Sequence, residues 1–218
     1  MDERKICFIA CVNSERYEQE LLKYLSNLIV PEGYGLEYLS IREAGSMTGG
    51  YNEGMYGSNA KYKVYLHQDA FIVNPYFIQD ILDIFREDTI GMLGMVGAPE
   101  MPENAVMWTV PRVGKLYANQ FYSSKQIVFG EIEGKYREVE AVDGLLMATQ
   151  YDLPWREDLF HGWDFYDVSQ SREFIENGYR VVVPNQKQPW CIHTDGFSKL
   201  KDYYKARRIF QEEYGKNR

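Results

Sequence analysis

The sequence predicts an α/β fold with a mostly parallel central sheet, and two stretches carry this prediction. Residues 6–12 form a near-continuous apolar run, which is typical of a strand covered on both faces. A helical pattern at 15–29 and an alternating strand pattern at 36–41 follow, and together they make one βαβ unit. Residues 64–66 form a second buried strand, which stops at two potential metal ligands. Such a strand followed by a helix is the layout of an open α/β site.

Composition and charge narrow the class of ligand. The 218 residues suffice for one domain with a sizeable core. A net charge of -8 opposes a nucleic-acid partner, because nucleic-acid phosphates are bound by positive surfaces. An anionic ligand of this acidic protein would therefore need a metal ion. Cys7, Cys11 and Cys191 lack the spacing of a metal site and are expected to be reduced, structural thiols.

The sequence also bears on location. No apolar run is long enough to span a bilayer, and the N-terminus lacks a long hydrophobic segment, so we expect a cytoplasmic protein without a transmembrane segment. Residues 198–218 are expected to form a C-terminal helix with a lysine- and arginine-rich face. We interpret that face as solvated, and peripheral contact with a membrane surface is the alternative. The pattern does not predict an oligomeric state.

The N-terminal half contains a helix start and a glycine-rich stretch. Asn13 and Ser14 interrupt the first apolar run and are expected to cap the helix at 15–29. Residues 45–57 are rich in glycine, so that the backbone could approach a ligand closely there. This stretch matches neither the dinucleotide-binding fingerprint nor the phosphate-binding P-loop.

His67 and Asp69 stand two residues apart at the end of the strand at 64–66. Side chains at i and i+2 of an extended chain point to the same side, so the imidazole and the carboxylate can converge on one cation. A polar turn that simply ends the strand is the alternative. Asn74 and Pro75 then predict a helix over 75–86.

The C-terminal half continues with strands predicted at 90–97, 140–149 and 179–183, and with a helix at 168–177 that Gly178 closes. Residues 98–140 show little periodicity and are expected to form a lid or a subsidiary hairpin, in which 128–139 turn at Glu133 and Gly134. Polar residues of interest flank these elements: Asp143 and Gly144 beside a strand, Asp164 and Asp167 at the helix start, and His193 in a glycine-ended turn.

The order of these motifs resembles a known family. The motifs are Gly50–Gly54, His67-Gln68-Asp69, Asp143-Gly144, the Trp163–Asp167 helix start and Ile192-His193. They resemble the glycosyltransferase-like family of the streptomycin-biosynthesis type, within the GT-A nucleotide-sugar transferases, over nearly the whole chain. The resemblance implies one GT-A (Rossmann-like) domain with three α/β/α layers.

The resemblance also implies roles for individual residues. Asp69 would be the direct metal ligand, His67 would replace the first aspartate of an Asp-x-Asp motif, and His193 would complete the metal shell. The residues implied on the donor side are Asn13, Glu43, Asn52, Gln68, Asp143 and Gly144. The catalytic base aligns with Asp167, and Asp164 is the neighbouring alternative. Trp163 and Trp190 would stack on the acceptor side or simply pack in the core. Ser169 departs from the family pattern, in which a second acidic residue is common.

The expected function is therefore metal-dependent, inverting transfer of a sugar from a nucleotide-sugar donor to a hydroxyl acceptor, either a glycan or a small molecule. Inversion is taken from the resemblance alone. The cofactor is expected to be Mn²⁺ or Mg²⁺, and the imidazole of His67 favours Mn²⁺. Two alternatives remain open: a nucleotide-sugar-binding protein of the same fold without turnover, and a metal-dependent hydrolase that uses the same three ligands.

Overall fold

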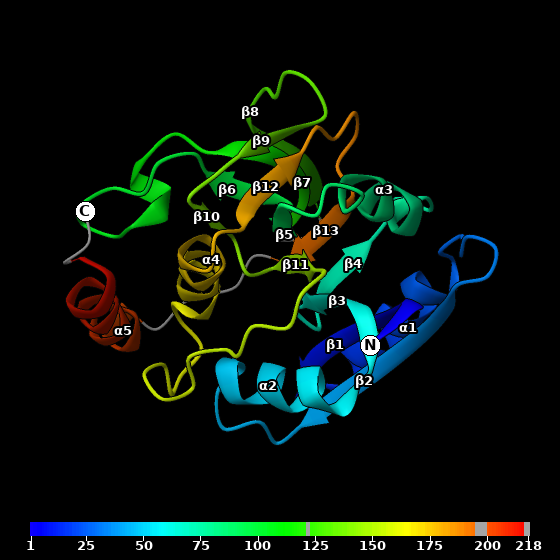
Figure 1. The fold of residues 1–218 in the computed structure, drawn as a ribbon, viewed down its shortest axis with the longest axis horizontal. Coiled ribbons are helices and arrows are strands. Elements are labelled where there is room, and N and C mark those ends of the chain that lie inside the picture. Colours follow the sequence, from blue (N-terminus) through cyan, green and yellow to red (C-terminus); the bar gives the residue numbers. More distant parts are fainter. Residues whose placement is uncertain (121–122, 195–199, 216–218) are drawn as a thin grey trace.

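The computed structural model describes residues 1–120, 123–194 and 200–215 (Figure 1). A seven-stranded sheet occupies its centre, with the strand order β2-β1-β3-β11-β5-β12-β9. Its strands are β1 (Asp2–Val12), β2 (Gly35–Arg42), β3 (Ala60–Leu66), β5 (Ile90–Gly94), β9 (Tyr136–Glu138), β11 (Leu146–Thr149) and β12 (Arg180–Pro184). Strands β2, β1, β3, β5 and β12 run in one direction, and β11 and β9 run in the other. The predicted mostly parallel central sheet is confirmed.

Helices cover both faces of this sheet. The helices are α1 (Glu15–Ser26), α2 (Met47–Gly57), α3 (Phe77–Ile84), α4 (Tyr166–Glu176) and α5 (Leu200–Tyr214). Alternate residues of β1 face opposite sides: Phe8 packs in one cluster with residues of α1 and α3, whereas Ile9 packs in another with residues of α2 and α4. The arrangement has the three α/β/α layers that the sequence predicts.

A second, six-stranded sheet extends the fold and was not predicted. Its strands are β4 (Ala70–Ile72), β6 (Val96–Ala98), β7 (Val113–Gln120), β8 (Ser123–Gly130), β10 (Ala141–Val142) and β13 (Cys191–Thr194). Strand β13 lies between β7 and β4, and β8 pairs with β7. The chain passes from β3 of the central sheet into β4 of the second sheet through residues 67–69. The two candidate metal ligands of this segment therefore lie where the two sheets meet.

The glycine-rich stretch at 45–57 forms helix α2, which the sequence analysis did not predict. A Cβ atom at Gly50 would lie 2.4 Å from Cys11 Sγ, and one at Gly54 would lie 2.3 Å from Ile9 Cγ2. These glycines allow the helix to lie directly on β1. Their role is close packing between helix and strand, instead of the ligand approach that we expected.

Several predicted boundaries need correction in the second half of the chain. The hairpin predicted at 128–139 is wrong: β7 and β8 form the hairpin, and residues 121–122 between them lie outside the described residues. Gly134, at φ +77°, instead turns the chain into β9, which pairs with β12. The strand predicted at 90–97 is divided into β5 and β6. A lid function for 98–140 stays a prediction.

Two predicted helices are shorter than expected: the helix predicted at 15–29 ends at Ser26, and the helix predicted at 75–86 covers Phe77–Ile84. The helix predicted at 75–86 begins at Phe77, because the Asn74 side chain accepts a hydrogen bond from the Tyr76 N–H and forms a turn before the helix. The helix predicted at 198–218 is described as α5, and residues 195–199 and 216–218 lie outside the described residues. Tyr203 and Phe210 of α5 pack with Val168 of α4, which places α5 beside α4 at one edge of the molecule (Figure 1).

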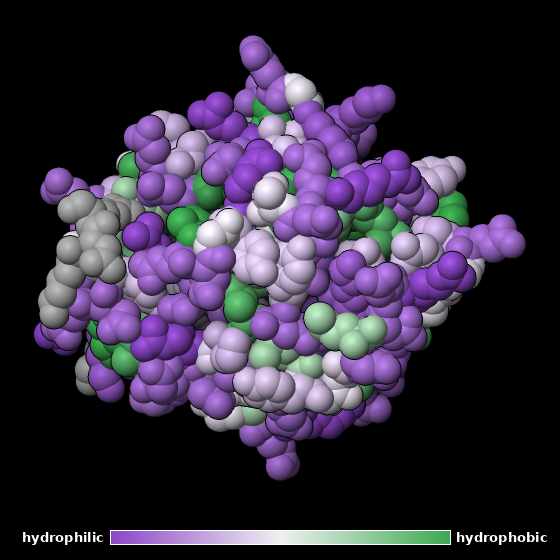
Figure 2. All heavy atoms as spheres, in the orientation of Figure 1, coloured by the Kyte–Doolittle hydropathy of each residue, from purple (hydrophilic) through white to green (hydrophobic). Residues whose placement is uncertain are grey.

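The surface is largely polar. Figure 2 shows hydrophilic side chains over most of the visible face, with small, scattered apolar patches between them. In the described part of the chain, no helix combines the length and the apolar character needed to cross a membrane. On α5, Lys205 and Arg208 are exposed, whereas Arg207 donates a hydrogen bond to the carbonyl of Asn104. Peripheral membrane contact and a cytoplasmic location stay predictions.

Candidate functional site

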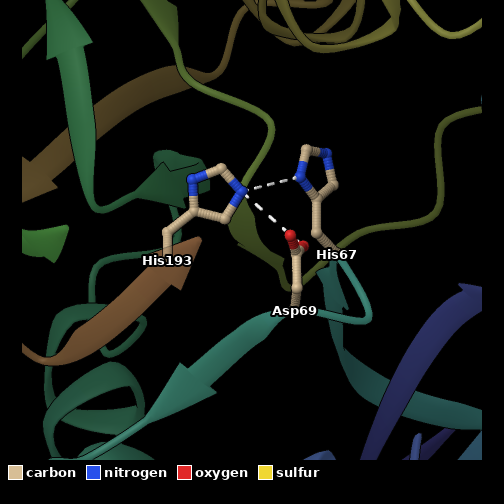
Figure 3. Close-up of side chains that lie close together, drawn as sticks. All are labelled: His67, Asp69 and His193. Carbon is tan, nitrogen blue, oxygen red and sulfur yellow. Dashed lines mark hydrogen bonds and ion pairs between the residues drawn. The ribbon is translucent and has the colours of Figure 1, made fainter. Parts of the chain in front are cut away.

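Three potential metal ligands converge where the two sheets meet. His67 follows β3, Asp69 precedes β4, and His193 lies in β13, opposite Ala70 in the antiparallel pairing with β4. His67 Nδ1 lies 3.2 Å from His193 Nε2, and His193 Nε2 lies 3.7 Å from Asp69 Oδ1. Figure 3 shows the three side chains pointing toward one another. The strand pairing therefore joins a local ligand pair to a third ligand far away in the sequence.

The environment of His67 favours a neutral imidazole. Burial, and then the neighbouring His193, lower the pKa of His67 to about 4, although Asp69 acts in the opposite direction. A neutral imidazole has a lone pair available for a cation. The other ring nitrogen, Nε2, is in hydrogen-bond contact with the Tyr166 hydroxyl. His67 is thus held from one side and presents Nδ1 to the other two ligands.

The donor set of this cluster fits a divalent cation. The ligand atoms of the three residues all lie within 4.8 Å of one another, so two imidazole nitrogens and one carboxylate oxygen can reach a common point. Imidazole nitrogen binds Mn²⁺ and the later transition metals better than it binds Mg²⁺, which prefers oxygen ligands. The residues present therefore fit a divalent metal ion.

A cavity of about 570 Å³, here called the Asn13 cavity, opens on one side of the cluster. Asn13, Glu43 and Gln68 line it together with His67 and Asp69. Gln68 Oε1 accepts hydrogen bonds from the Asn13 and Ser14 N–H groups, and Gln68 Nε2 donates to Asn13 Oδ1. Glu43 follows β2 at a φ of 58°, in the left-handed region that non-glycine residues adopt only uncommonly.

A second cavity of about 550 Å³, here called the Asp167 cavity, also borders the cluster. It shares His67, Asp69 and Trp163 with the Asn13 cavity. The new lining residues include the carboxylates of Asp143, Asp164 and Asp167 and the guanidinium of Arg112. Two neighbouring cavities therefore meet at the metal cluster.

Asp167 lies in the first turn of α4 and is held by the backbone. Its carboxylate accepts hydrogen bonds from the Gly144 N–H at 3.0 Å and from the Val168 N–H at 2.8 Å. Burial and then the nearby Asp143 raise the pKa of Asp167 to about 7, although both hydrogen bonds oppose this change. A carboxylate with such a pKa can accept a proton near neutral pH and hold it.

Asp164 and Asp143 stand beside Asp167 with different surroundings. Asp164 precedes the helix, and burial followed by the neighbouring Asp202 raises its pKa. Asp143 Oδ1 accepts the Leu145 N–H, so its carboxylate stabilises the turn between β10 and β11. Trp163 is 51% exposed and lines both cavities, which makes its ring accessible to a ligand.

Two predicted site residues lie elsewhere. Asn52 is buried, and its amide bonds with both the N–H and the carbonyl of Trp155, so it anchors a loop and is not available to a donor. Trp190 packs edge-on against Phe77 in the core and lines neither the Asn13 cavity nor the Asp167 cavity. Both residues are corrected to structural roles.

The sequence analysis missed two residues of the site. Arg112 belongs to a stretch without periodicity, and its guanidinium lies 4.1 Å from the centre of the Phe129 ring. It brings positive charge into a cavity that is otherwise acidic. Tyr166 is next to Asp167 in sequence, and this adjacency was the available signal.

Comparison with known proteins identifies the family. The family described as "Glycosyltransferase like family" matches residues 7–214, which is nearly the whole chain. The chain belongs to this glycosyltransferase-like family. No curated protein sequence matches it as a relative. The family assignment agrees with the resemblance seen in the motifs.

Solved structures similar to this glycosyltransferase-like chain share its fold. The structure of S. aureus TarS 1–349 in complex with UDP has a TM-score of 0.58 at 14% identity, over 96% of this chain and 65% of TarS 1–349. Mannosyltransferase PcManGT from Pyrobaculum calidifontis, in complex with GDP-Man and Mn²⁺, has a TM-score of 0.56 at 12% identity, over 90% of this chain and 57% of its own. The identities are too low to transfer more than the fold.

A Drosophila galactosyltransferase is also similar to this chain in structure. A mutant of β1,4-galactosyltransferase 7 in complex with manganese, UDP-Gal and xylobiose has a TM-score of 0.53 at 11% identity, over 91% of this chain and 78% of that one. The glycosyltransferase-like chain spans less than two thirds of the length of TarS 1–349 and of PcManGT. These structures establish a GT-A-type fold for the chain.

Proposed function

We propose that this protein is a metal-dependent, inverting glycosyltransferase that moves a sugar from a nucleoside-diphosphate donor to a hydroxyl group of an acceptor. The observation that carries the proposal is the meeting of the Asn13 and Asp167 cavities at His67, Asp69 and His193. A nucleotide sugar needs two adjoining compartments, one for the nucleoside and one for the sugar, with its diphosphate between them. In this chain the candidate cation site lies at that position.

The nucleoside is assigned to the Asn13 cavity. Asn13 is fixed by its hydrogen bonds with Gln68, so its side chain is preorganised at the end of β1. Glu43, at the end of β2, offers a carboxylate that can accept hydrogen bonds from ribose hydroxyls. Both residues lie at the carboxyl ends of parallel strands, where ligands bind in open α/β sheets. The comparison structures that contain UDP, GDP-Man and UDP-Gal support a nucleotide donor.

The donor diphosphate would face the metal cluster. A divalent cation held by His67, Asp69 and His193 would stabilise the negative charge that develops on the departing nucleoside diphosphate. The protein itself is acidic, with a net charge of -8, so a bound cation would supply positive charge that the diphosphate needs. Arg112 in the Asp167 cavity adds one fixed positive charge near the reacting groups. Mn²⁺ in two of the comparison structures supports this cofactor.

The sugar and the acceptor are assigned to the Asp167 cavity. An acceptor hydroxyl oxygen attacks the anomeric carbon, the new C–O bond forms, and the bond from that carbon to the diphosphate oxygen breaks. The diphosphate leaves with the electron pair, and Asp167 takes the hydroxyl proton. A single displacement opposite the leaving group inverts the anomeric centre. The exposed ring of Trp163 can stack on a sugar ring at the mouth of this cavity.

The test measures transfer and donor binding separately. Asp167→Asn keeps the size of the side chain and removes the basic oxygen, so transfer should fall by ~10²–10⁴-fold while calorimetric affinity for a nucleoside diphosphate with Mn²⁺ changes little. Asp164→Asn, in the same cavity, is the matched control and should cost less. Asp69→Ala should remove the Mn²⁺ dependence of diphosphate binding.

Each alternative function predicts a different result. If Asp164→Asn stops turnover and Asp167→Asn remains active, the base is Asp164. A protein that binds nucleotide sugars with Mn²⁺ but shows no transfer to any mono- or disaccharide acceptor and no donor hydrolysis would be a binding protein. Equal diphosphate affinity with and without Mn²⁺, together with hydrolysis of esters that carry no nucleotide, would favour the hydrolase.

A further inference from the structure

Tyr166 connects the metal cluster to the start of helix α4. Its hydroxyl contacts His67 Nε2, the nitrogen that faces away from His193 and Asp69. The ring of Tyr166 is buried in an aromatic group with Tyr51 and Trp155. The position of the hydroxyl is therefore fixed by packing, and it does not depend on a flexible side chain.

Gly144 provides the space that this contact needs. A Cβ atom at position 144 would lie 2.1 Å from the Tyr166 hydroxyl oxygen and 2.4 Å from the ring carbon that carries it. Any side chain at this position would push Tyr166 away from His67. The chain thus combines a glycine, a buried tyrosine and a histidine at three separate points of the sequence to form one contact.

We propose that Tyr166 is a positioning residue for the metal ligand His67. The Tyr166 hydroxyl oxygen accepts a hydrogen bond from His67 Nε2–H, and this fixes the tautomer in which Nδ1 carries the free lone pair. That lone pair faces His193 and Asp69, where the cation would bind. Partners of this kind orient ligating histidines and raise their basicity. The inference rests on the proposed metal site and goes beyond it by assigning the residue that prepares the site.

The same helix turn carries the proposed base. Asp167 follows Tyr166 directly, and its carboxylate accepts the N–H of Gly144. Gly144 thus contacts both residues: the space left by its missing side chain holds the Tyr166 hydroxyl, and its N–H bonds to Asp167. A shift of α4 that moved the base would also move the hydroxyl that holds His67. The arrangement ties the geometry of the metal ligand to that of the base.

The experiment measures Mn²⁺ binding without any substrate. Tyr166→Phe removes the hydroxyl and keeps the ring, so Mn²⁺ affinity in an electron paramagnetic resonance titration should fall by about 10–100-fold. The spin-echo modulation from Mn²⁺-bound imidazole nitrogen should also weaken. Gly144→Ala acts on the same contact from the opposite side and should reduce affinity in the same direction.

Tyr51→Phe is the matched control. Tyr51 belongs to the same aromatic group, and its buried hydroxyl has no hydrogen-bond partner among the described residues, so its removal should leave Mn²⁺ affinity unchanged. Equal Mn²⁺ affinity and equal imidazole modulation in wild type, Tyr166→Phe and Tyr51→Phe would overturn this inference and leave the metal site standing. A wild-type protein that binds no Mn²⁺ would overturn both.

Discussion

Asp167 is the residue in which several physical effects oppose one another most clearly. Two backbone N–H groups favour its charged form, while burial and the nearby Asp143 favour the neutral form and dominate, because the pKa rises to about 7. A base needs to accept a proton during the reaction and release it afterwards, which is easiest when its pKa lies near the working pH. The structure thus gives Asp167 a pKa that suits the proposed role as base, without any unusual residue type.

This pKa has a consequence for stability, which can be measured without a substrate. The carboxyl binds its proton more tightly in the folded protein than in the unfolded chain, so protonation of Asp167 stabilises the folded protein. This stabilisation is present at low pH and is lost as the pH rises through about 7. Asp167→Asn should remove this dependence. The free energy of unfolding of the variant minus that of wild type should therefore increase by on the order of 1–3 kcal/mol as the pH is raised from acidic to mildly alkaline.

Urea unfolding in the presence of EDTA checks this prediction, because a bound cation would itself change the pKa. Asp158 offers a control, since its pKa is lowered by Arg156 and its stability contribution therefore changes at acidic pH. The difference in the free energy of unfolding between Asp158→Asn and wild type should therefore stay constant at pH values near and above neutrality. Parallel pH profiles for wild type and Asp167→Asn would show that the Asp167 pKa is not raised.

The side-chain convergence that the sequence predicted from residue spacing is local. His67 and Asp69 share a short segment at the end of one strand, so their convergence follows from the two-residue spacing. His193 joins them only through the pairing of β13 with β4, and its role as a third ligand was implied by the family resemblance alone. Tyr166 was missed because a tyrosine among other aromatic residues is equally typical of a core. Its hydroxyl gains significance only once His67 lies beside it.

At the scale of elements, the misinterpreted stretch is α2. Glycine has a low helix propensity, so a segment with several glycines is usually assigned to a loop. In this chain the low propensity is outweighed by packing, because Gly50 and Gly54 let the helix contact β1 at a distance that no other residue permits. Strands β1 and β3 were predicted because each contains a continuous apolar run, and β2 was predicted because its apolar residues alternate. The second sheet was not, because its pairings join distant segments.

The packing of α2 gives a direct prediction. Gly54→Ala places a methyl group 2.3 Å from Ile9 Cγ2, so the helix or the strand has to move. We expect a loss of ~1–3 kcal/mol in the free energy of unfolding, as for other overpacked cores. Chemical denaturation followed by circular dichroism measures it.

Gly57, at the end of the same helix, is the control for this substitution. A Cβ atom there would meet Leu39 Cδ1 at 3.4 Å, which is an ordinary contact. Gly57→Ala should therefore be neutral or should stabilise the helix slightly, because alanine has the higher helix propensity. If the two alanine variants unfold at the same denaturant concentration, the close approach of α2 to β1 does not constrain position 54.

At the scale of the whole molecule, the candidate metal cluster depends on both sheets. Segment 67–69 passes from one sheet to the other, and His193 reaches this segment from β13. His67 and His193 are separated by 126 positions in sequence, and their contact depends on the assembly of both sheets. The unfolded chain would not hold these ligands together.

This long separation has a kinetic consequence. A cation that binds only the assembled cluster should stabilise the native protein and leave the earlier stages of folding unaffected. In stopped-flow measurements, addition of Mn²⁺ should therefore leave the refolding rate unchanged. The unfolding rate should fall by the same factor by which Mn²⁺ raises the equilibrium constant for folding. Refolding that accelerates with Mn²⁺ would instead mean that β13 and the segment after β3 come together before the rate-limiting step. A metal titration of the two rates therefore shows whether the two sheets meet before or after that step.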